Sequence, residues 1–302
     1  MAAQTIEKPA PSSRWHFSDD CNGCGTCRDV CPHGVLKVVD KRAVVDAERK
    51  PYCFGCGQCA VFCAKGALTW QNDDGTAIVP LGEHPVNDTQ VMALLESRRS
   101  IRLFSKKAVD QASIDRVVAA ASTAPMGFPP HTTKILVVQD ENERAHLAAE
   151  MRKMYAGLIN AFGSWIGRTI MRWMMSPEMY KLVAGHVIDI AKYSNDLYEK
   201  QGVDRYCYSA PVVMLFYGNR WSAAYEANAY IAATHAMLGA HAMGLGTTMI
   251  DLIPPAINRT PALKARWGLE KDDIVVSALV MGWPKYKPRA AIRRKLAGVK
   301  SI

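Results

Sequence analysis

Eight of the nine cysteines in this 302-residue chain lie between residues 21 and 63, in two runs with the same spacing, C-x2-C-x2-C-x3-C. The runs are Cys21, Cys24, Cys27 and Cys31, and Cys53, Cys56, Cys59 and Cys63. This spacing is typical of thiolates that bind a 4Fe-4S cluster, and the glycines between the cysteines allow the backbone to wrap around the inorganic core. The sequence therefore predicts two 4Fe-4S clusters.

The duplication also predicts how the ligands are shared. In two-cluster ferredoxins the fourth cysteine of each run binds the other cluster. One predicted ligand set is Cys21, Cys24, Cys27 and Cys63, and the other is Cys53, Cys56, Cys59 and Cys31. The alternative is zinc, but zinc sites typically use two C-x2-C pairs with a longer gap. Cys207 has no neighbouring cysteine and is expected to be a small buried residue.

Short alternating segments accompany the cysteines. Residues 35–40 and 42–48 predict a hairpin, and residues 67–70 predict a further strand. Residues 71–88 are rich in turn-forming residues, so a domain boundary is placed there. The predicted organisation is a flexible N-terminal tail (1–17), a two-cluster ferredoxin domain (18–72), a linker (73–87) and a second domain (88–302).

The second domain mixes helical and strand patterns. Helices are predicted at 88–99 behind an Asn87/Asp88 cap, at 114–122, at 223–244 and at 261–269, the last with Thr260 as its N-cap. Buried strands are predicted at 134–140 and 273–284. The second domain is therefore expected to contain both helices and strands.

Charge and composition restrict the classes of partner and compartment. Lys and Arg number 37 against 28 Asp and Glu, a net charge of +9 that suggests anionic partners without implying nucleic acid. The N-terminus lacks a signal-peptide core, and no window of about 20 residues is free of charge, so a cytoplasmic protein is expected. No Ser-His-Asp set, P-loop or dinucleotide GxGxxG is found, and no side chain is assigned as catalytic.

Five segments occur in an order that resembles the nitroreductase family. They are ESRRSIRLF (96–104), TAP-x-G (123–127), SAPVVML (209–215), MGLGTTMID (243–251) and LVMGWP (279–284). The resemblance spans residues 88–297, and with the cysteine runs in front the chain resembles iron–sulfur nitroreductase fusions. The implied fold is α+β, a ferredoxin-like 2x(4Fe-4S) domain followed by a nitroreductase-like α/β/α FMN domain.

The resemblance implies which residues contact FMN. The phosphate and ribityl chain would be bound by Arg98, Arg99, Ser100, Arg102, Arg293 and Arg294. Guanidinium groups suit a phosphate because their donors match its oxygens. The ring would lie beside Pro125, Met126 and Gly127, beside the strip Thr248, Met249, Ile250 and Asp251, and near Arg205. Residues 128–134 read FPPHTTK where many relatives have an Asn and a Gln-Pro-Trp run, so those contacts are not carried over.

An insertion at about 151–200 carries a helical stripe of large side chains. The stripe comprises Met151, Tyr155, Leu158, Phe162, Trp165, Thr169 and Trp173. Basic residues occur in this insertion, and no acid occurs from 151 to 177. Three interpretations remain open: a helical excursion that packs on its own core or a second copy, a cap for a bulky hydrophobic substrate, and peripheral membrane contact, which is not favoured.

The expected function is a flavin-dependent oxidoreductase. The resemblance implies that clusters relay electrons from a low-potential donor, a ferredoxin or flavodoxin or else NAD(P)H, to FMN, which reduces a hydrophobic nitro, quinone, enone or similar organic acceptor. A homodimer with FMN at the subunit interface is implied. The alternatives are an electron-transfer protein whose flavin serves a docked partner, and a flavin-remodelling or reductive dehalogenating enzyme of the same fold.

Overall fold

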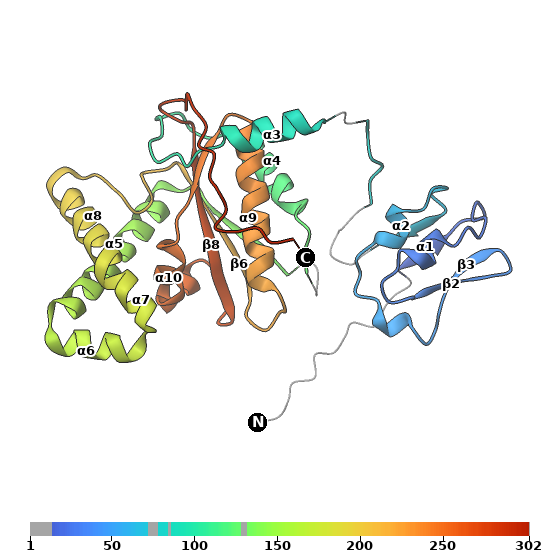
Figure 1. The fold of residues 1–302 in the computed structure, drawn as a ribbon, viewed down its shortest axis with the longest axis horizontal. Coiled ribbons are helices and arrows are strands. Elements are labelled where there is room, and N and C mark those ends of the chain that lie inside the picture. Colours follow the sequence, from blue (N-terminus) through green and yellow to red (C-terminus); the bar gives the residue numbers. More distant parts are fainter. Residues whose placement is uncertain (1–13, 72–77, 84–85, 128–131, 302) are drawn as a thin grey trace. The chain divides into compact units, whose positions relative to one another are not determined.

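The computed structural model describes residues 14–71, 78–83, 86–127 and 132–301, which fold as two compact units. The first unit is built from described residues up to 83, and the second from residue 86 onward. Figure 1 shows the elements of each unit. Within the described residues, no helix has the length and apolar character needed to cross a membrane.

The first unit contains two small antiparallel sheets. Strand β1 (Trp15–Phe17) pairs with β4 (Leu68–Trp70), and β2 (Leu36–Val39) pairs with β3 (Arg42–Val45). Asp40 and Lys41, between β2 and β3, both have positive φ, as the tightest hairpin turns require. The predicted hairpin and the strand predicted at 67–70 are confirmed. The helical elements are α1 (Thr26–Asp29), a 3-10 turn (Lys50–Tyr52) and α2 (Gln58–Val61).

The prediction of a flexible tail over 1–17 is wrong at its C-terminal end. Trp15 lies opposite Trp70 in the β1–β4 pair, and both indole rings are buried in the core of the first unit. Ladder hydrogen bonds and this burial make residues 15–17 part of the fold. Residues 1–13 of the predicted tail, and residues 73–77 and 84–85 of the predicted linker, lie outside the described residues.

The second unit has an antiparallel sheet between two helical layers. The strand order is β5 (Lys134–Val138), β6 (Val212–Asn219), β8 (Asp273–Gly282) and β7 (Gly246–Met249). Alternate β6 residues face opposite layers. Val213 and Leu215 pack on the side of α5 (Glu141–Gly163), and Met214 and Phe216 pack with α4 (Gln111–Ser122) and α9 (Tyr225–Ala242). Figure 1 shows the sheet between these layers. The predicted α+β fold class is confirmed.

The helices of the second unit confirm one predicted N-cap and contradict another. The helical bounds are α3 (Asp88–Ser97), α4 (Gln111–Ser122), α9 (Tyr225–Ala242), α10 (Ile253–Asn258) and α11 (Pro261–Arg266). Asn87 caps α3 through a reciprocal pair of hydrogen bonds with Gln90, as predicted. Thr260 precedes α11, but its hydroxyl donates to the Ala256 carbonyl at 2.8 Å instead of capping the helix. The strand at 134–140 ends at Val138 and is only partly buried, because it forms a sheet edge.

A helical excursion, residues 141–201, lies between β5 and β6. It comprises α5 (Glu141–Gly163), α6 (Trp165–Met174), α7 (Pro177–Leu182), a π-helical turn (Val183–Val187) and α8 (Ile188–Gln201). It begins about ten residues earlier than predicted. The predicted stripe is also not continuous, because Ser164 breaks the helix and its hydroxyl accepts from Gly167 N at 3.0 Å. Tyr155 and Phe162 are consequently buried, whereas Trp165 and Trp173 are exposed.

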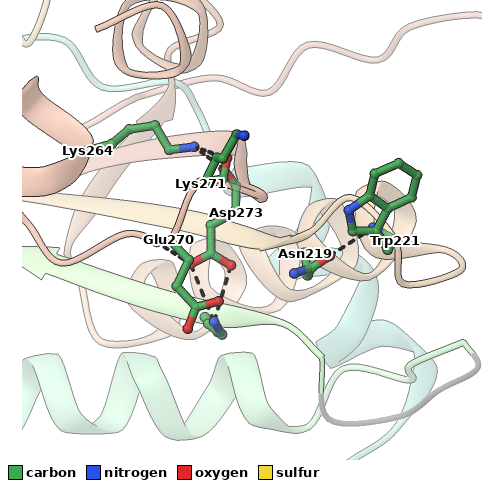
Figure 2. A network of polar contacts seen from close by, with 7 residues as sticks. Asn219, Trp221, Lys264, Glu270, Lys271 and Asp273 are labelled. Atoms are coloured by element: carbon green, nitrogen blue, oxygen red, sulfur yellow. Dashed lines mark hydrogen bonds and ion pairs between the residues drawn. The ribbon is translucent and has the colours of Figure 1, made fainter. Parts of the chain in front are cut away.

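A polar network fixes the start of β8 (Figure 2). The Asp273 carboxylate is buried and accepts from Lys134 Nζ at 3.2 Å and from Glu270 N at 3.1 Å. Lys264 Nζ donates to the carbonyls of Asp273 and Lys271 at 2.6 and 2.9 Å. Because a buried charge is costly unless it is paired, these contacts hold β8 against β5 and α11.

Candidate cofactor sites

The eight clustered cysteines line two separate cavities of the first unit. One cavity is lined by Cys21, Cys24, Cys27 and Cys63, and the other by Cys31, Cys53, Cys56 and Cys59. Each cavity thus receives three thiols from one run and the fourth from the other run. This grouping coincides with the two predicted ligand sets.

Glycines in the left-handed backbone conformation form the turns that orient the thiols. Gly25 (φ 82°) and Gly57 (φ 71°) precede the two four-residue helices that carry Cys27 and Cys59. At Gly23 (φ 68°) a Cβ atom would lie 2.5 Å from the backbone of the hairpin turn. Glycine is therefore required there both by the backbone conformation and by the close approach of the chain.

Backbone amides and burial set the electrostatics of the thiols. Val35 N donates to Cys31 Sγ at 3.3 Å, and Ala43 N donates to Cys21 Sγ at 3.4 Å. Hydrogen bonds to the Thr26 hydroxyl and backbone lower the pKa of Cys24, whereas burial raises the pKa of Cys59 to about 11. Partly buried thiols and amide donors suit ligation by iron, which supplies the positive charge that a desolvated thiolate needs.

The thiols are not arranged for a mononuclear metal. Among the described residues, no three Cys, His, Asp or Glu side chains converge on a point that could hold one ion. In a cubane each thiolate binds a different iron, so such convergence is not required.

In the second unit, the segment that follows α3 lies against β7. Ser100 forms a parallel bridge with Thr247, and Ile101 N donates to the Thr247 carbonyl at 2.9 Å. A Cβ at Gly246 would lie 2.7 Å from the Ile101 side chain, so only glycine permits this contact. The residues predicted to bind phosphate are thereby placed beside the strip that begins at Thr248.

The chain after β8 pairs with residues 103–105, which follow the predicted phosphate-binding segment. Ser105 N donates to the Trp283 carbonyl at 2.8 Å, and Lys285 N donates to the Leu103 carbonyl at 3.0 Å. Arg293 forms an ion pair with Glu96, with Nε and Oε1 2.9 Å apart. The predicted residues Arg293 and Arg294 therefore follow a stretch of chain that is paired with residues 103–105.

Three of the predicted cations form an arginine cluster, Arg98, Arg99 and Arg294. Burial, followed by the charges of Arg99 and Arg294, lowers the pKa of Arg98. Mutual repulsion of this kind is relieved by an anion, and a phosphate offers two negative charges. Arg102, the remaining predicted cation of this segment, is exposed.

His241 lies at the edge of the arginine cluster. Its Nε2 is 2.8 Å from Ser97 Oγ, and burial together with the charges of Arg98 and Arg99 lowers its pKa. No pattern in the sequence indicates that the end of α9 meets the end of α3.

The predicted ring contacts at residues 125–127 lie against the other end of α9. Gly127 N donates to the Oδ1 atom of buried Asn228 at 2.7 Å. Met126 borders a cavity of about 310 Å³ that is otherwise lined by α4, α9 and the start of β5. Residues 128–131 of the FPPHTTK segment lie outside the described residues.

One chain therefore places the predicted FMN contacts in two groups. Asn228 and His241 are thirteen positions apart on α9, which corresponds to roughly 20 Å along a helix. The turn at Pro125, Met126 and Gly127 lies near the first of these residues, and the arginine cluster lies near the second. The structure places Ser100 beside Thr247, which precedes the strip 248–251, and leaves residues 125–127 apart from the arginine cluster.

Arg205 lies in a turn held by a neighbouring carboxylate. Asp204 accepts from the backbone amides of Tyr206, Cys207 and Ser209 at 2.8 to 3.2 Å. Tyr208 and Ser209 adopt positive φ, a strained conformation that these hydrogen bonds stabilise. Cys207 is buried, as predicted, and Arg205 is exposed.

Tyr155 connects this turn to the end of the strip 248–251. Its ring stacks on Tyr206 with centroids 5.3 Å apart, and its hydroxyl donates to the Leu252 carbonyl at 2.9 Å. The sequence alone places Tyr155 only on a helical stripe of large side chains. Its hydroxyl contact joins residues nearly one hundred positions apart and could not be inferred from a helical pattern.

Replacing Tyr155 by phenylalanine is expected to lower the free energy of unfolding by about 1 to 2 kcal/mol, because the ring stack is kept and the Leu252 carbonyl loses its donor. Urea denaturation of the two proteins measures this difference. Tyr193→Phe, on the exposed side of α8, is the control and should change stability little. Equal losses of unfolding free energy in the two variants would show that the Tyr155 hydroxyl stabilises the fold no more than an exposed hydroxyl does.

The comparisons with known proteins agree with this architecture. A profile of the Nitroreductase family matches residues 95–283, and a profile of the 4Fe-4S dicluster domain matches residues 20–68. No curated protein sequence matches the chain significantly.

Two solved structures share the fold of the second unit. A Bacteroides fragilis nitroreductase with bound FMN aligns at 15% identity and a TM-score of 0.51, over 72% of this chain and 99% of its own. A Desulfitobacterium hafniense nitroreductase with bound FMN aligns at 17% identity and a TM-score of 0.50, over 71% of this chain and 100% of its own. With the family profile covering well over half of the sequence, the chain belongs to the nitroreductase family of oxidoreductases and has a 4Fe-4S ferredoxin-type domain in front of its nitroreductase domain.

Proposed function

We propose that this chain is an FMN-dependent reductase in which two 4Fe-4S clusters carry electrons from a low-potential donor to the flavin, for reduction of a nitro, quinone, enone or related organic acceptor. The observation that carries the proposal is the presence, in one chain, of two four-thiol cavities and of an arginine cluster beside β7. The two nitroreductase structures described above contain FMN, which supports the same cofactor here.

In this proposal the two cavities hold one cluster each. The amide hydrogen bonds to Cys31 and Cys21 would stabilise the thiolates and adjust the potentials of the clusters. The grouping of thiols across the two runs supports the shared ligation. The boundaries of the cluster-binding domain are proposed as residues 15–72, since β1 closes its core.

The arginine cluster would bind the FMN phosphate, with Ser100 and Arg102 beside it. Arg293 would contribute only by exchanging its partner Glu96 for the phosphate. The strip Thr248–Asp251 would border the ring, where a backbone donor is insensitive to the identity of the side chain. Arg205 lies in the turn that the Asp204 carboxylate stabilises. It would approach the pyrimidine edge of the flavin and favour the anionic reduced form.

A second copy of the chain would complete the site. The turn at Pro125, Met126 and Gly127 is roughly 20 Å along α9 from the arginine cluster of the same chain. A homodimer brings the turn of one copy to the flavin held by the other. The apolar cavity of about 310 Å³ beside Met126 has the size of a small-ligand site, which supports a small organic acceptor over a docked protein.

FMN, when bound, accepts electrons singly and delivers them as a pair, which is the chemistry that joins clusters to an organic acceptor. This chain's residues would hold the phosphate, border the ring and shield it from water. No side chain is assigned as an acid, so the proton is proposed to come from solvent.

The phosphate assignment has a direct test. FMN is expected to co-purify near one per chain, and Arg98→Ala or Arg294→Ala should weaken its affinity about ten- to a hundredfold, since a charge-assisted hydrogen bond contributes about 1.5 to 3 kcal/mol. Fluorescence titration of apoprotein with FMN measures the affinity. Arg289→Ala is the matched control on the exposed C-terminal segment. Equal affinities in all three variants would remove the phosphate assignment.

A further inference from the structure

Helix α6 exposes an apolar face in the helical excursion. Trp165 is 71% exposed and Trp173 is 88% exposed, and Ile166, Ile170 and Met174 are also exposed. Their positions place all five side chains on one half of the helix surface. These five residues are called the α6 face below. Such a contiguous apolar surface is uncommon on a protein unless a partner covers it.

The opposite side of α6 packs on the protein. Met171 contacts the small core formed by Phe162, Val183 and Ile188, and the α6 face points away from that core. In Figure 1, α6 lies at the end of the excursion, at the opposite side of the second unit from α3 and α9. The α6 face is therefore separate from the proposed FMN site of the same chain.

Cations border the α6 face, and α6 itself carries no acid. Arg168 and Arg172 are exposed on one edge of the helix, and the sequence has no Asp or Glu from residue 151 to residue 177. Arg168 Nη1 donates to the Phe162 carbonyl at 3.1 Å, and the Arg172 guanidinium lies 6.0 Å from the Tyr180 ring centroid. The helix thus combines exposed tryptophans, aliphatic side chains and positive charge.

We propose that the α6 face binds the surface of an anionic lipid bilayer, with the tryptophans and aliphatic side chains entering the headgroup boundary and the arginines contacting lipid phosphates. Tryptophan favours this boundary because its ring is apolar and its N–H is polar. A strongly amphipathic helix with a basic edge is the form that lies in the interface plane. The helix would lie on the bilayer and not cross it.

The charge of the face favours an anionic surface as its partner. Arg168 and Arg172 are exposed at its edge, and α6 itself carries no acid. A bilayer requires no matching shape, and its negative charge complements the arginines. Association would be reversible and would weaken as salt rises.

Binding of the full chain to vesicles tests the proposal. Vesicles of phosphatidylcholine with about one third phosphatidylglycerol are compared with vesicles of phosphatidylcholine alone by co-sedimentation. We expect clear binding only to the anionic vesicles, with a blue shift of tryptophan emission. Trp165→Ala/Trp173→Ala should reduce the binding constant at least tenfold, and Arg172→Gln about fivefold.

Trp221→Ala is the matched control, because Trp221 is 76% exposed on a loop of the sheet end, with its ring directed away from the polar network in Figure 2. It should bind vesicles like the wild type. Equal binding by the control and the double variant would overturn the proposal, as would absence of binding to anionic vesicles. Dissociation of a dimer by the double variant, seen by sedimentation velocity without lipid, would assign the face to a second copy instead.

Discussion

Substituting Cys27 or Cys63 by alanine is expected to remove the same iron–sulfur centre, so that iron per chain falls from about eight to about four in both variants. The two residues belong to different runs but line one cavity. Cys31→Ala should instead affect the centre of the other cavity, together with Cys59. Iron and sulfide analysis after anaerobic preparation gives the count, and electron paramagnetic resonance of the reduced protein identifies which centre is lost.

Cys207→Ala is the control for this experiment. Cys207 is buried in the second unit, where its Sγ lies 3.9 Å from Met151 Sδ, and its loss should leave the iron content unchanged. If Cys27→Ala and Cys63→Ala removed spectroscopically different centres, each run would bind its own cluster and the shared ligation would be wrong. A wild-type protein with about four iron atoms would show that only one cavity is filled.

The rate at which the bound flavin is reduced is expected to depend strongly on the electron donor. A two-electron donor such as NADH could reduce a flavin directly, and a cluster domain would then have no part in turnover. We therefore expect reduced ferredoxin to reduce the bound flavin much faster than NADH or NADPH, as measured by anaerobic stopped-flow absorbance. Two clusters and the FMN phosphate contribute about −2 each, so the charge of +9 falls to about +3, which still favours an acidic donor. The ferredoxin rate should fall as salt rises.

A shortened chain beginning near Gly82 supplies the control. It lacks all eight cluster cysteines and should lose the ferredoxin route while still accepting electrons from dithionite. Reduction by ferredoxin at the same rate in the shortened and full chains would mean that the cluster domain has a structural or regulatory role.

Local signals in the sequence determined much of the architecture. The period-two pattern around residues 36–45 predicted the hairpin, and the capping residues before Asp88 predicted the start of α3. The cysteine spacing predicted the two ligand sets that coincide with the two cavities, because three ligands of each set come from one short turn. These features depend on neighbours within a few residues, where backbone geometry alone limits the outcome.

Long-range packing decided the rest. Trp15 belongs to the first unit because it meets a strand more than fifty residues later. The distribution of predicted FMN contacts over the two ends of α9 follows from how α3 and α4 pack along that helix. The sequence identified the residue types that are predicted to bind cofactors. Only the tertiary structure decided which of them meet in one chain, since that depends on contacts between elements whose separation no local pattern encodes.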